Sequence, residues 1–309
     1  MKSLIFLLLL TVTISLPAQQ KKFFSVKGKQ VIGVDGKPFH MRGTNLGNWL
    51  VPEGYMFKFE NVNSPRLINQ TLTELIGDVE TRKFWKQFLE NYITAEDIHY
   101  LKTIGMNSIR IPFNYRLFTN EDYMGGEGEA RGFALLDRVI NWCRKEKLYV
   151  LLDMHCAPGG QTGDNIDDGV GYPFLFEDEE SQALTTRIWR RIADHYKNDE
   201  IIIGYDLLNE PIAHFFDSAH FNPKLEPFYK RVTKAIREVD KNHLIFLGGS
   251  QWNSNFRPFG PPFDDKLVYT FHKYWTPASK EVIQQYLDFS DKYNVPLYCG
   301  ETGENTDEW

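Results

Sequence analysis

Apolar runs typical of buried strands alternate along the chain with amphipathic segments typical of helices. From residue 42 onward, the strand-like runs are 42–45, 107–113, 148–155, 201–211, 243–250, 267–274 and 296–303. The segments with helical periodicity between the later runs are 134–147, 181–198, 224–242 and 279–294. The strands are almost continuously apolar, which indicates that protein covers both of their faces, as in a parallel sheet.

The order of strands and helices predicts the α/β class. An open doubly wound sheet usually carries a GxGxxG turn after its first strand, and GTNLGNW at 43–49 lacks that spacing. We therefore expect a (β/α)8 TIM barrel, with the eighth strand and its flanking helices missing from this chain. We also expect a hairpin within 23–41 that turns at Asp35-Gly36, and a helix capped by Thr94 with Asp97.

The N-terminal segment has the pattern of a secretory signal peptide, with Lys2, an apolar run from Leu4 to Leu16 and the small residue Ala18. The run is shorter than the ~20 residues that span a bilayer, so we expect cleavage near Ala18 and no stable membrane anchor. The product would be secreted or periplasmic, with 1–18 as signal and 19–309 as one catalytic barrel, incomplete at its C-terminus. The net charge of −6 and the absence of a basic run argue against a nucleic-acid partner.

Neither a metal nor another cofactor is expected. The cysteines Cys143, Cys156 and Cys299 lack the close spacing of a zinc or redox site, and we expect buried free thiols. The loop 163–172 contains several acids, but Ile166 stands where an EF-hand loop that began at Asp164 would need its second oxygen ligand. Calcium binding is therefore not predicted there.

Polar side chains follow the apolar strands, and the carboxyl ends of barrel strands meet at one rim, where barrel enzymes carry out their chemistry. These residues are Asn45, Arg110, His155, Asn209, Glu210, Gln251, His272, Tyr274 and Glu301. Glycoside hydrolysis needs two carboxyl groups that flank the scissile bond. Glu210 and Glu301 end the fourth and seventh strands, which lie across a barrel mouth from each other.

Each residue also has a purely structural interpretation. Asn-Glu-Pro at 209–211 could be a surface turn, Glu301 an interior carboxylate, and Arg110 an ion-pair partner within the barrel. His155 and His272 could be core histidines. His272 and Tyr274 are two residues apart on one strand, so both side chains face the same way, which supports a shared site.

Sugars stack on flat aromatic rings, and three tryptophans follow strands at the rim. We expect Trp49, Trp252 and Trp275 to be such platforms, whereas tryptophans within the helical segments are better assigned to packing.

Six motifs together resemble glycoside hydrolase family 5, from about residue 23 to the end: RGTNLGNWL, SIRIPFNY, LLDMHCAPGG, YDLLNEP, FHKYW and CGETG. The first motif and APGGQ look especially like the exo-β-1,3-glucanase branch and related bacterial β-glucanases. The resemblance implies that Glu210 is the acid/base and Glu301 the nucleophile. It also implies that Asn209 binds the sugar 2-hydroxyl, that Arg110 and Tyr274 keep Glu301 ionised, and that His155 and His272 line the subsite of the reacting sugar.

The leading hypothesis is a monomeric, retaining hydrolase of β-glucan polysaccharide or oligosaccharide. A β-mannanase or another β-hexosan hydrolase is the alternative within the same mechanism. A non-catalytic carbohydrate-binding protein, or an inactive truncated barrel, is the alternative of another class. We expect residues 19–309 alone to be weakly active or inactive, because an unpaired final strand would then hold Glu301.

Overall fold

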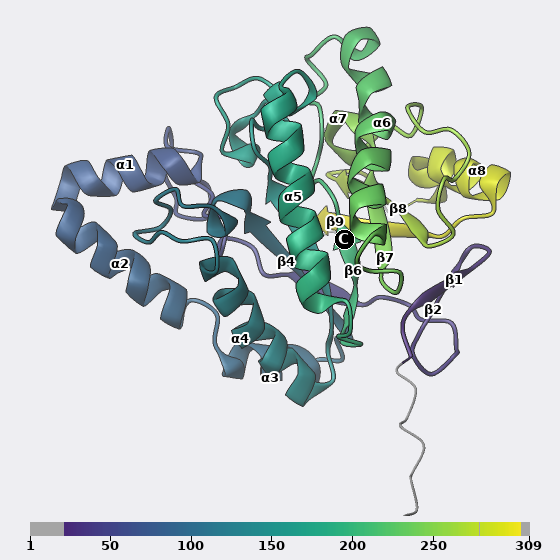
Figure 1. Cartoon of the computed structure of the whole chain (residues 1–309), viewed down its shortest axis with the longest axis horizontal. Coiled ribbons are helices and arrows are strands. Elements are labelled where there is room, and N and C mark those ends of the chain that lie inside the picture. The colour runs from purple at the N-terminus through teal and green to yellow at the C-terminus, as the bar shows by residue number, and fades with distance from the viewer. Residues whose placement is uncertain (1–21, 278, 304–309) are drawn as a thin grey trace, which may run out of the picture.

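The computed structural model describes residues 22–277 and 279–303. Seven parallel strands form one sheet and neighbour each other in chain order (Figure 1). They are β3 (Gly43–Asn45), β4 (Ser108–Asn114), β5 (Tyr149–Cys156), β6 (Ile202–Asp206), β7 (Leu244–Gly248), β8 (Leu267–Tyr274) and β9 (Leu297–Gly303). This order confirms the predicted barrel architecture. The predicted signal segment 1–18 lies outside the described residues.

Helices connect most of these strands and cover the outside of the sheet (Figure 1). They are α3 (Ala95–Thr103), α4 (Arg131–Glu146), α5 (Glu179–Tyr196), α6 (Ser218–Arg237), the short α7 (Ser250–Asn253) and α8 (Gln284–Tyr293). The predicted cap of α3 is present, because the Thr94 backbone N–H donates to Asp97 Oδ2 at 2.8 Å. No helix of the described chain is both long and apolar enough to cross a membrane.

The segment between β3 and α3 holds two helices that the apolar pattern did not reveal, α1 (Pro65–Ile76) and α2 (Asp78–Asn91). Ser64 caps α1 by accepting a hydrogen bond from the Leu67 backbone N–H, and proline occupies the first helical position. The two helices form an arm at one side of the molecule (Figure 1).

The strands separate two cores because successive side chains point to opposite faces. On β8, Leu267, Tyr269 and Phe271 belong to the large core beneath the helices, whereas Val268 belongs to a second core inside the barrel. The other members of the inner core are Phe24, Val31, Leu151, Ile203, Leu244 and Phe246. Apolar side chains therefore fill the bottom of the barrel interior. The polar side chains that also point into the barrel lie above them.

A hairpin of β1 (Ser25–Lys27) and β2 (Gln30–Ile32) supplies two members of the inner core, Phe24 beside β1 and Val31 within β2. The predicted turn at Asp35-Gly36 is present, but it is the second of two turns in this segment. The strands turn at Gly28 and Lys29, where Gly28 adopts a left-handed φ of 57°. The turn at Asp35-Gly36 brings the chain back antiparallel to β2, where Ile32 bridges Pro38 and the Phe39 backbone N–H donates to the Val31 carbonyl oxygen at 2.8 Å.

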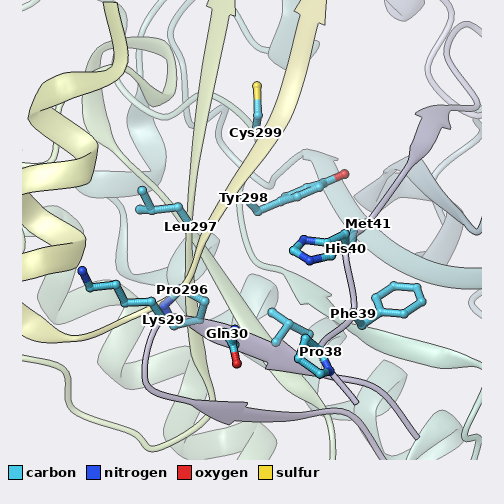
Figure 2. A pocket seen from close by; sticks show the side chains of 11 residues that line it. Lys29, Gln30, Pro38, Phe39, His40, Met41, Pro296, Leu297, Tyr298 and Cys299 are labelled. Carbon is cyan, nitrogen blue, oxygen red and sulfur yellow. The ribbon is translucent and has the colours of Figure 1, made fainter. Parts of the chain in front are cut away.

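The sheet is open between its first and last strands, since β3 pairs only with β4 and β9 only with β8 among the described residues. The side chain of Asn45 reaches across this opening and donates to the Gly300 carbonyl oxygen at 3.4 Å. At the other end of the opening, the hairpin, residues 38–41 and the start of β9 line a cavity of about 260 Å³ (Figure 2). That cavity contains none of the predicted site residues.

Candidate active site

Arg110 is the centre of a buried charge network at the mouth of the barrel. Its Nε donates to Asp206 Oδ2 at 2.9 Å, and its Nη1 donates to Glu301 Oε1 at 2.7 Å. Its Nη2 donates to Asn209 Oδ1 at 3.0 Å and lies 3.1 Å from Asp153 Oδ1. Burial alone would lower the pKa of Arg110, but the surrounding carboxylates raise it well above its usual range. A permanent positive charge therefore stands directly beneath Glu301.

Glu301 is held in its ionised form. Besides the bond from Arg110, its Oε2 accepts a hydrogen bond from the Tyr274 hydroxyl at 2.9 Å. Burial would raise the pKa of Glu301, but the basic side chains His272, Arg110 and His155, together with the Tyr274 hydrogen bond, lower it to about 2. A carboxylate that is ionised and aimed into the mouth can act as a nucleophile.

Glu210 follows β6 on a tight turn and has a left-handed φ of 47°. The APGGQT segment after β5 holds this turn. The Thr162 hydroxyl donates to the Glu210 carbonyl oxygen at 2.7 Å, and Gln161 Nε2 donates to the Asn209 carbonyl oxygen at 2.8 Å. Gln161 is itself fully buried and also donates to the His155 carbonyl oxygen at 2.7 Å. The loop after β5 thus fixes the backbone that carries Glu210.

Two histidines from separate strands, His155 on β5 and His272 on β8, complete the cluster. His272 Nδ1 lies 2.8 Å from Glu210 Oε1 and 3.7 Å from Glu301 Oε2. His155 Nδ1 lies 2.7 Å from Asp153 Oδ2, and its Nε2 faces the Asn209 amide nitrogen at 3.2 Å. The structure therefore brings Arg110, His155, Asn209, Glu210, His272, Tyr274 and Glu301 into one continuous network.

The sequence matches a known family over most of its length. The model of Cellulase (glycosyl hydrolase family 5) matches residues 69–309, which is more than half of the chain. The chain belongs to glycosyl hydrolase family 5.

Curated relatives of this family 5 chain include a β-xylosidase of Phanerodontia chrysosporium, 34% identical over 256 residues, which are 82% of this chain and 52% of the relative. Endoglucanase C of Acetivibrio thermocellus is also 34% identical, over 62% of this chain and 53% of its own length. The chain thus spans about half the length of these relatives. The crystal structure of a rutinosidase from Aspergillus niger shares the fold, with a TM-score of 0.67, 18% identity, and coverage of 85% of this chain and 80% of that one.

Of the three tryptophans predicted as sugar platforms, Trp49 is not available to a sugar. Its side chain is fully buried, and its indole N–H donates to the Leu89 carbonyl oxygen at 3.3 Å. The prediction for Trp49 is therefore wrong, because the ring packs beneath the α1–α2 arm. Trp275 is 69% exposed beside Tyr274. Trp252 is half-buried, and its ring contacts His214 edge-on at 4.6 Å between centroids.

Several residues of the site escaped the sequence analysis. Glu53, on the loop after β3, lies near both catalytic candidates, and burial together with the charges of Glu301 and Glu210 raises its pKa to about 7, against an opposing effect of His155. Tyr55 on the same loop is 66% exposed. The available signal was an acid and an aromatic residue shortly after the end of a strand. The apolar pattern did not resolve the long segment between β3 and α3, so it did not show which of its side chains turn toward the mouth.

The described part of the chain contains one group of three side chains that could offer metal ligands, Glu210, His272 and Glu301, whose atoms lie within 4.8 Å of one another. Both carboxylates are engaged by protein donors or by an imidazole, through the contacts of Arg110, Tyr274 and His272 described above. In the loop 163–172, Asp167 accepts hydrogen bonds from three backbone N–H groups, and Asp168 forms an ion pair with a neighbouring arginine. The loop acids are thus bound to protein donors.

The cysteines are free, as predicted, but their burial was predicted only in part. Cys143 and Cys156 are buried, whereas Cys299 on the open edge strand β9 is exposed. The difference arises because β9 has a neighbouring strand on one side only.

Proposed function

We propose that this family 5 chain hydrolyses β-linked glucan with retention of configuration, with Glu301 as nucleophile and Glu210 as acid/base. The observation that carries the proposal is the contrast between two adjacent carboxyl groups. Arg110 and Tyr274 bind Glu301 in its ionised form, whereas Glu210 contacts only an imidazole among these groups. One oxygen of Glu210 lies within 4.8 Å of one oxygen of Glu301. This spacing supports the retaining geometry of ~5–5.5 Å over the ~6.5–9.5 Å of inverting enzymes.

In this mechanism Glu301 attacks the anomeric carbon while Glu210 gives its proton to the leaving glycosidic oxygen. The resulting glycosyl ester is then cleaved by water, from which Glu210 takes a proton, and Glu301 is released as a carboxylate. Arg110 and Tyr274 stabilise the carboxylate before attack and after release. Asn209, fixed between Arg110 and His155, lies where it can bind the sugar 2-hydroxyl.

The names of two relatives and two exposed aromatic rings bear on the substrate class. One relative is named an endoglucanase and another a β-xylosidase. The exposed rings of Tyr55 and Trp275 provide flat surfaces against which a sugar can stack. We favour β-glucan, and a β-mannan or another β-hexosan is the alternative that a substrate panel decides. The alternative of another class is a carbohydrate-binding protein without catalytic activity. Such a protein would bind sugar at these rings but would form no product.

For the whole protein, we propose cleavage of the signal segment near Ala18, release from the cell, and action as a monomer, with residues 19–309 as part of its catalytic barrel. The early Lys2, the apolar run from Leu4 to Leu16 and the small residue Ala18 support this location.

The test combines covalent labelling with substrate analysis. A 2-deoxy-2-fluoro-β-glucoside with a dinitrophenolate leaving group should label the protein, and peptide mapping should place the sugar on Glu301. Products from laminarin, lichenan, carboxymethyl cellulose, mannan and an aryl β-xyloside should then show a preference for glucan. Labelling of another residue would contradict the assigned nucleophile. Preferred cleavage of mannan or xyloside would contradict the substrate class alone.

A further inference from the structure

Asn253, on the short turn after β7, contacts the histidine of the reacting pair from its far side. The residue is fully buried, and its Nδ2 lies 3.1 Å from His272 Nε2. Gln251, Trp252 and Asn253 all have left-handed φ values, 51°, 57° and 57°. Such a run of non-glycine residues is strained and marks a position that the surrounding structure imposes.

The neighbouring backbone is shaped around this contact. Ser250 and Asn255 exchange two backbone hydrogen bonds, of 3.0 and 2.9 Å, and thereby close the turn. A Cβ atom at Gly248 would lie 2.2 Å from Asn253 Oδ1, and one at Gly300 would lie 2.8 Å from His272 Nε2. Glycine at both positions gives the amide and the imidazole the space to meet.

The amide group determines where the imidazole carries its proton. The Asn253 NH2 group can only donate, so His272 Nε2 must accept and therefore carries no proton. The imidazole is then neutral, and its one N–H is at Nδ1, which faces Glu210 Oε1 at 2.8 Å. Asn253 Oδ1 is buried without a hydrogen-bond partner. Turning the amide around would bury an unpaired N–H group in that place, which proteins tolerate less well than an unpaired carbonyl oxygen.

The same arrangement occurs on the opposite side of the site, where its orientation is fixed independently. Arg110 donates to Asn209 Oδ1, so the Asn209 NH2 group must point toward His155 Nε2. His155 Nδ1 in turn faces Asp153. An asparagine, a histidine and a carboxyl group thus lie in line on each side. The parallel concerns these contacts and not the charge, because Asp153 raises the pKa of His155 to about 9 against the effect of burial.

We propose that Asn253 is a positioning residue that keeps His272 neutral and thereby keeps the proton of the general acid on Glu210. The inference rests on the proposed function, in which Glu210 is that acid. The charged and titratable groups facing His272 are Glu210 after β6, Asp206 on β6, Glu301 on β9, Tyr274 on β8 and, through Glu301, Arg110 on β4.

The carboxyl groups in this set favour an imidazolium, which would take the proton that Glu210 needs for the leaving group. A positive charge on His272 would be the largest single effect lowering the pKa of Glu301. Arg110, His155 and the Tyr274 hydrogen bond act on Glu301 in the same direction, so we expect Glu301 to stay ionised beside a neutral His272.

The substitution Asn253→Asp replaces the donor by an acceptor of the same shape. His272 should then carry protons on both nitrogens, and Glu210 should lose its proton more readily. The alkaline limb of the kcat/KM profile should move down by about one to three pH units. At neutral pH the ratio of kcat/KM for a dinitrophenyl β-glucoside to that for an unactivated glucan should rise about tenfold or more, because only the unactivated substrate needs the acid.

Asn255→Asp is the matched control, since it places the same charge two residues further on, where Asn255 contacts Gln251 and the Arg257 backbone instead of His272. It should leave the pH profile and the substrate ratio unchanged. An unchanged profile and ratio in Asn253→Asp, or equal shifts in both variants, would overturn the proposal.

Nitrogen NMR of the labelled histidines tests the inference without turnover, with His272 assigned by its loss in His272→Gln. In the unmodified protein we expect a proton on Nδ1 and none on Nε2, and in Asn253→Asp a proton on both. A proton on Nε2 of His272 in the unmodified protein would overturn the proposal even if Asn253→Asp fails to fold. If the protein hydrolyses no glycoside, the proposed function fails, while the NMR result still decides the protonation of His272.

Discussion

Asp206→Asn should remove a pH-dependent cost to stability that the wild-type barrel carries in its interior. Asp206 is fully buried beside Asp153, with Arg110 as its nearest cation. Burial is the main reason that its pKa is raised from 3.8 to about 7, with Arg110 opposing and Asp153 adding to the effect. Between these two values the folded protein holds a proton that the unfolded chain has released. The bound proton therefore contributes its full stabilisation of the folded state below about pH 4, and this contribution is lost as the pH rises toward 7.

The magnitude follows from the size of the pKa change. A rise from 3.8 to about 7 corresponds, at about 1.4 kcal/mol per unit, to roughly 4 kcal/mol of unfolding free energy lost across this window. Asparagine resembles the protonated acid in shape and cannot ionise, so the variant should lack this loss. The difference in unfolding free energy between variant and wild type should shift by roughly 3–4 kcal/mol in favour of the variant between pH 4 and pH 7.

Urea unfolding at several pH values between 4 and 7.5 measures this difference. Asp240→Asn is the matched control, because Asp240 is also a buried aspartate but its pKa is lowered: the hydrogen bonds and charge of His243 and the hydrogen bond from Tyr205 outweigh the effect of burial. Its stabilising effect is present above the unfolded pKa, so Asp240→Asn should lose stability relative to wild type as the pH rises above about 4. Parallel stability curves for wild type and Asp206→Asn would refute the reasoning.

Two further predictions concern the charge network and the aromatic residues. Arg110→Met should reduce kcat by about 1,000-fold or more and destabilise the fold by about 3–5 kcal/mol at pH 7, because it leaves buried carboxylates unpaired. The control Arg237→Met lies outside the site and should lower the melting temperature with kcat unchanged. Equal losses of kcat in both variants would contradict the role of Arg110. Trp275→Ala should raise KM for oligosaccharides without changing the melting temperature, whereas Trp49→Ala should cost about 3–5 kcal/mol of stability; the opposite pattern would restore Trp49 as a sugar platform.

The strands of the barrel could be predicted from the sequence because their buried faces leave continuous apolar runs. The polar residues at or near the end of the runs then gave much of the rim, including Asn209 and both glutamates, since parallel strands end at a common edge. Arg110 was recognised as a polar residue within its run, inside β4. The cap of α3 was also readable, because Thr94 and Asp97 form a local contact that needs no tertiary information.

The sequence pattern did not predict the direction in which a side chain points or its contacts with residues far along the chain. Trp49 follows β3 as expected, but nothing in its local sequence shows that its ring turns into the core beneath α2. Asp35-Gly36 makes the turn that its composition predicts. The earlier turn at Gly28 was missed because the two strands on either side of it are only three residues long. Asn253 lies in a segment without strand or helix periodicity, and its importance depends on a histidine nineteen residues away.

The most direct test of the central claim is the anomeric configuration of the sugar azide that forms when azide rescues each glutamate variant. Proton NMR of long incubations with a dinitrophenyl β-glucoside identifies the product even when turnover is slow. If Glu301 is the nucleophile, azide takes its place in Glu301→Ala and gives the α-glucosyl azide. If Glu210 is the acid/base, azide attacks the glycosyl ester in Glu210→Ala and gives the β-glucosyl azide. The reverse assignment of the two products, or the same anomer from both variants, would contradict the account.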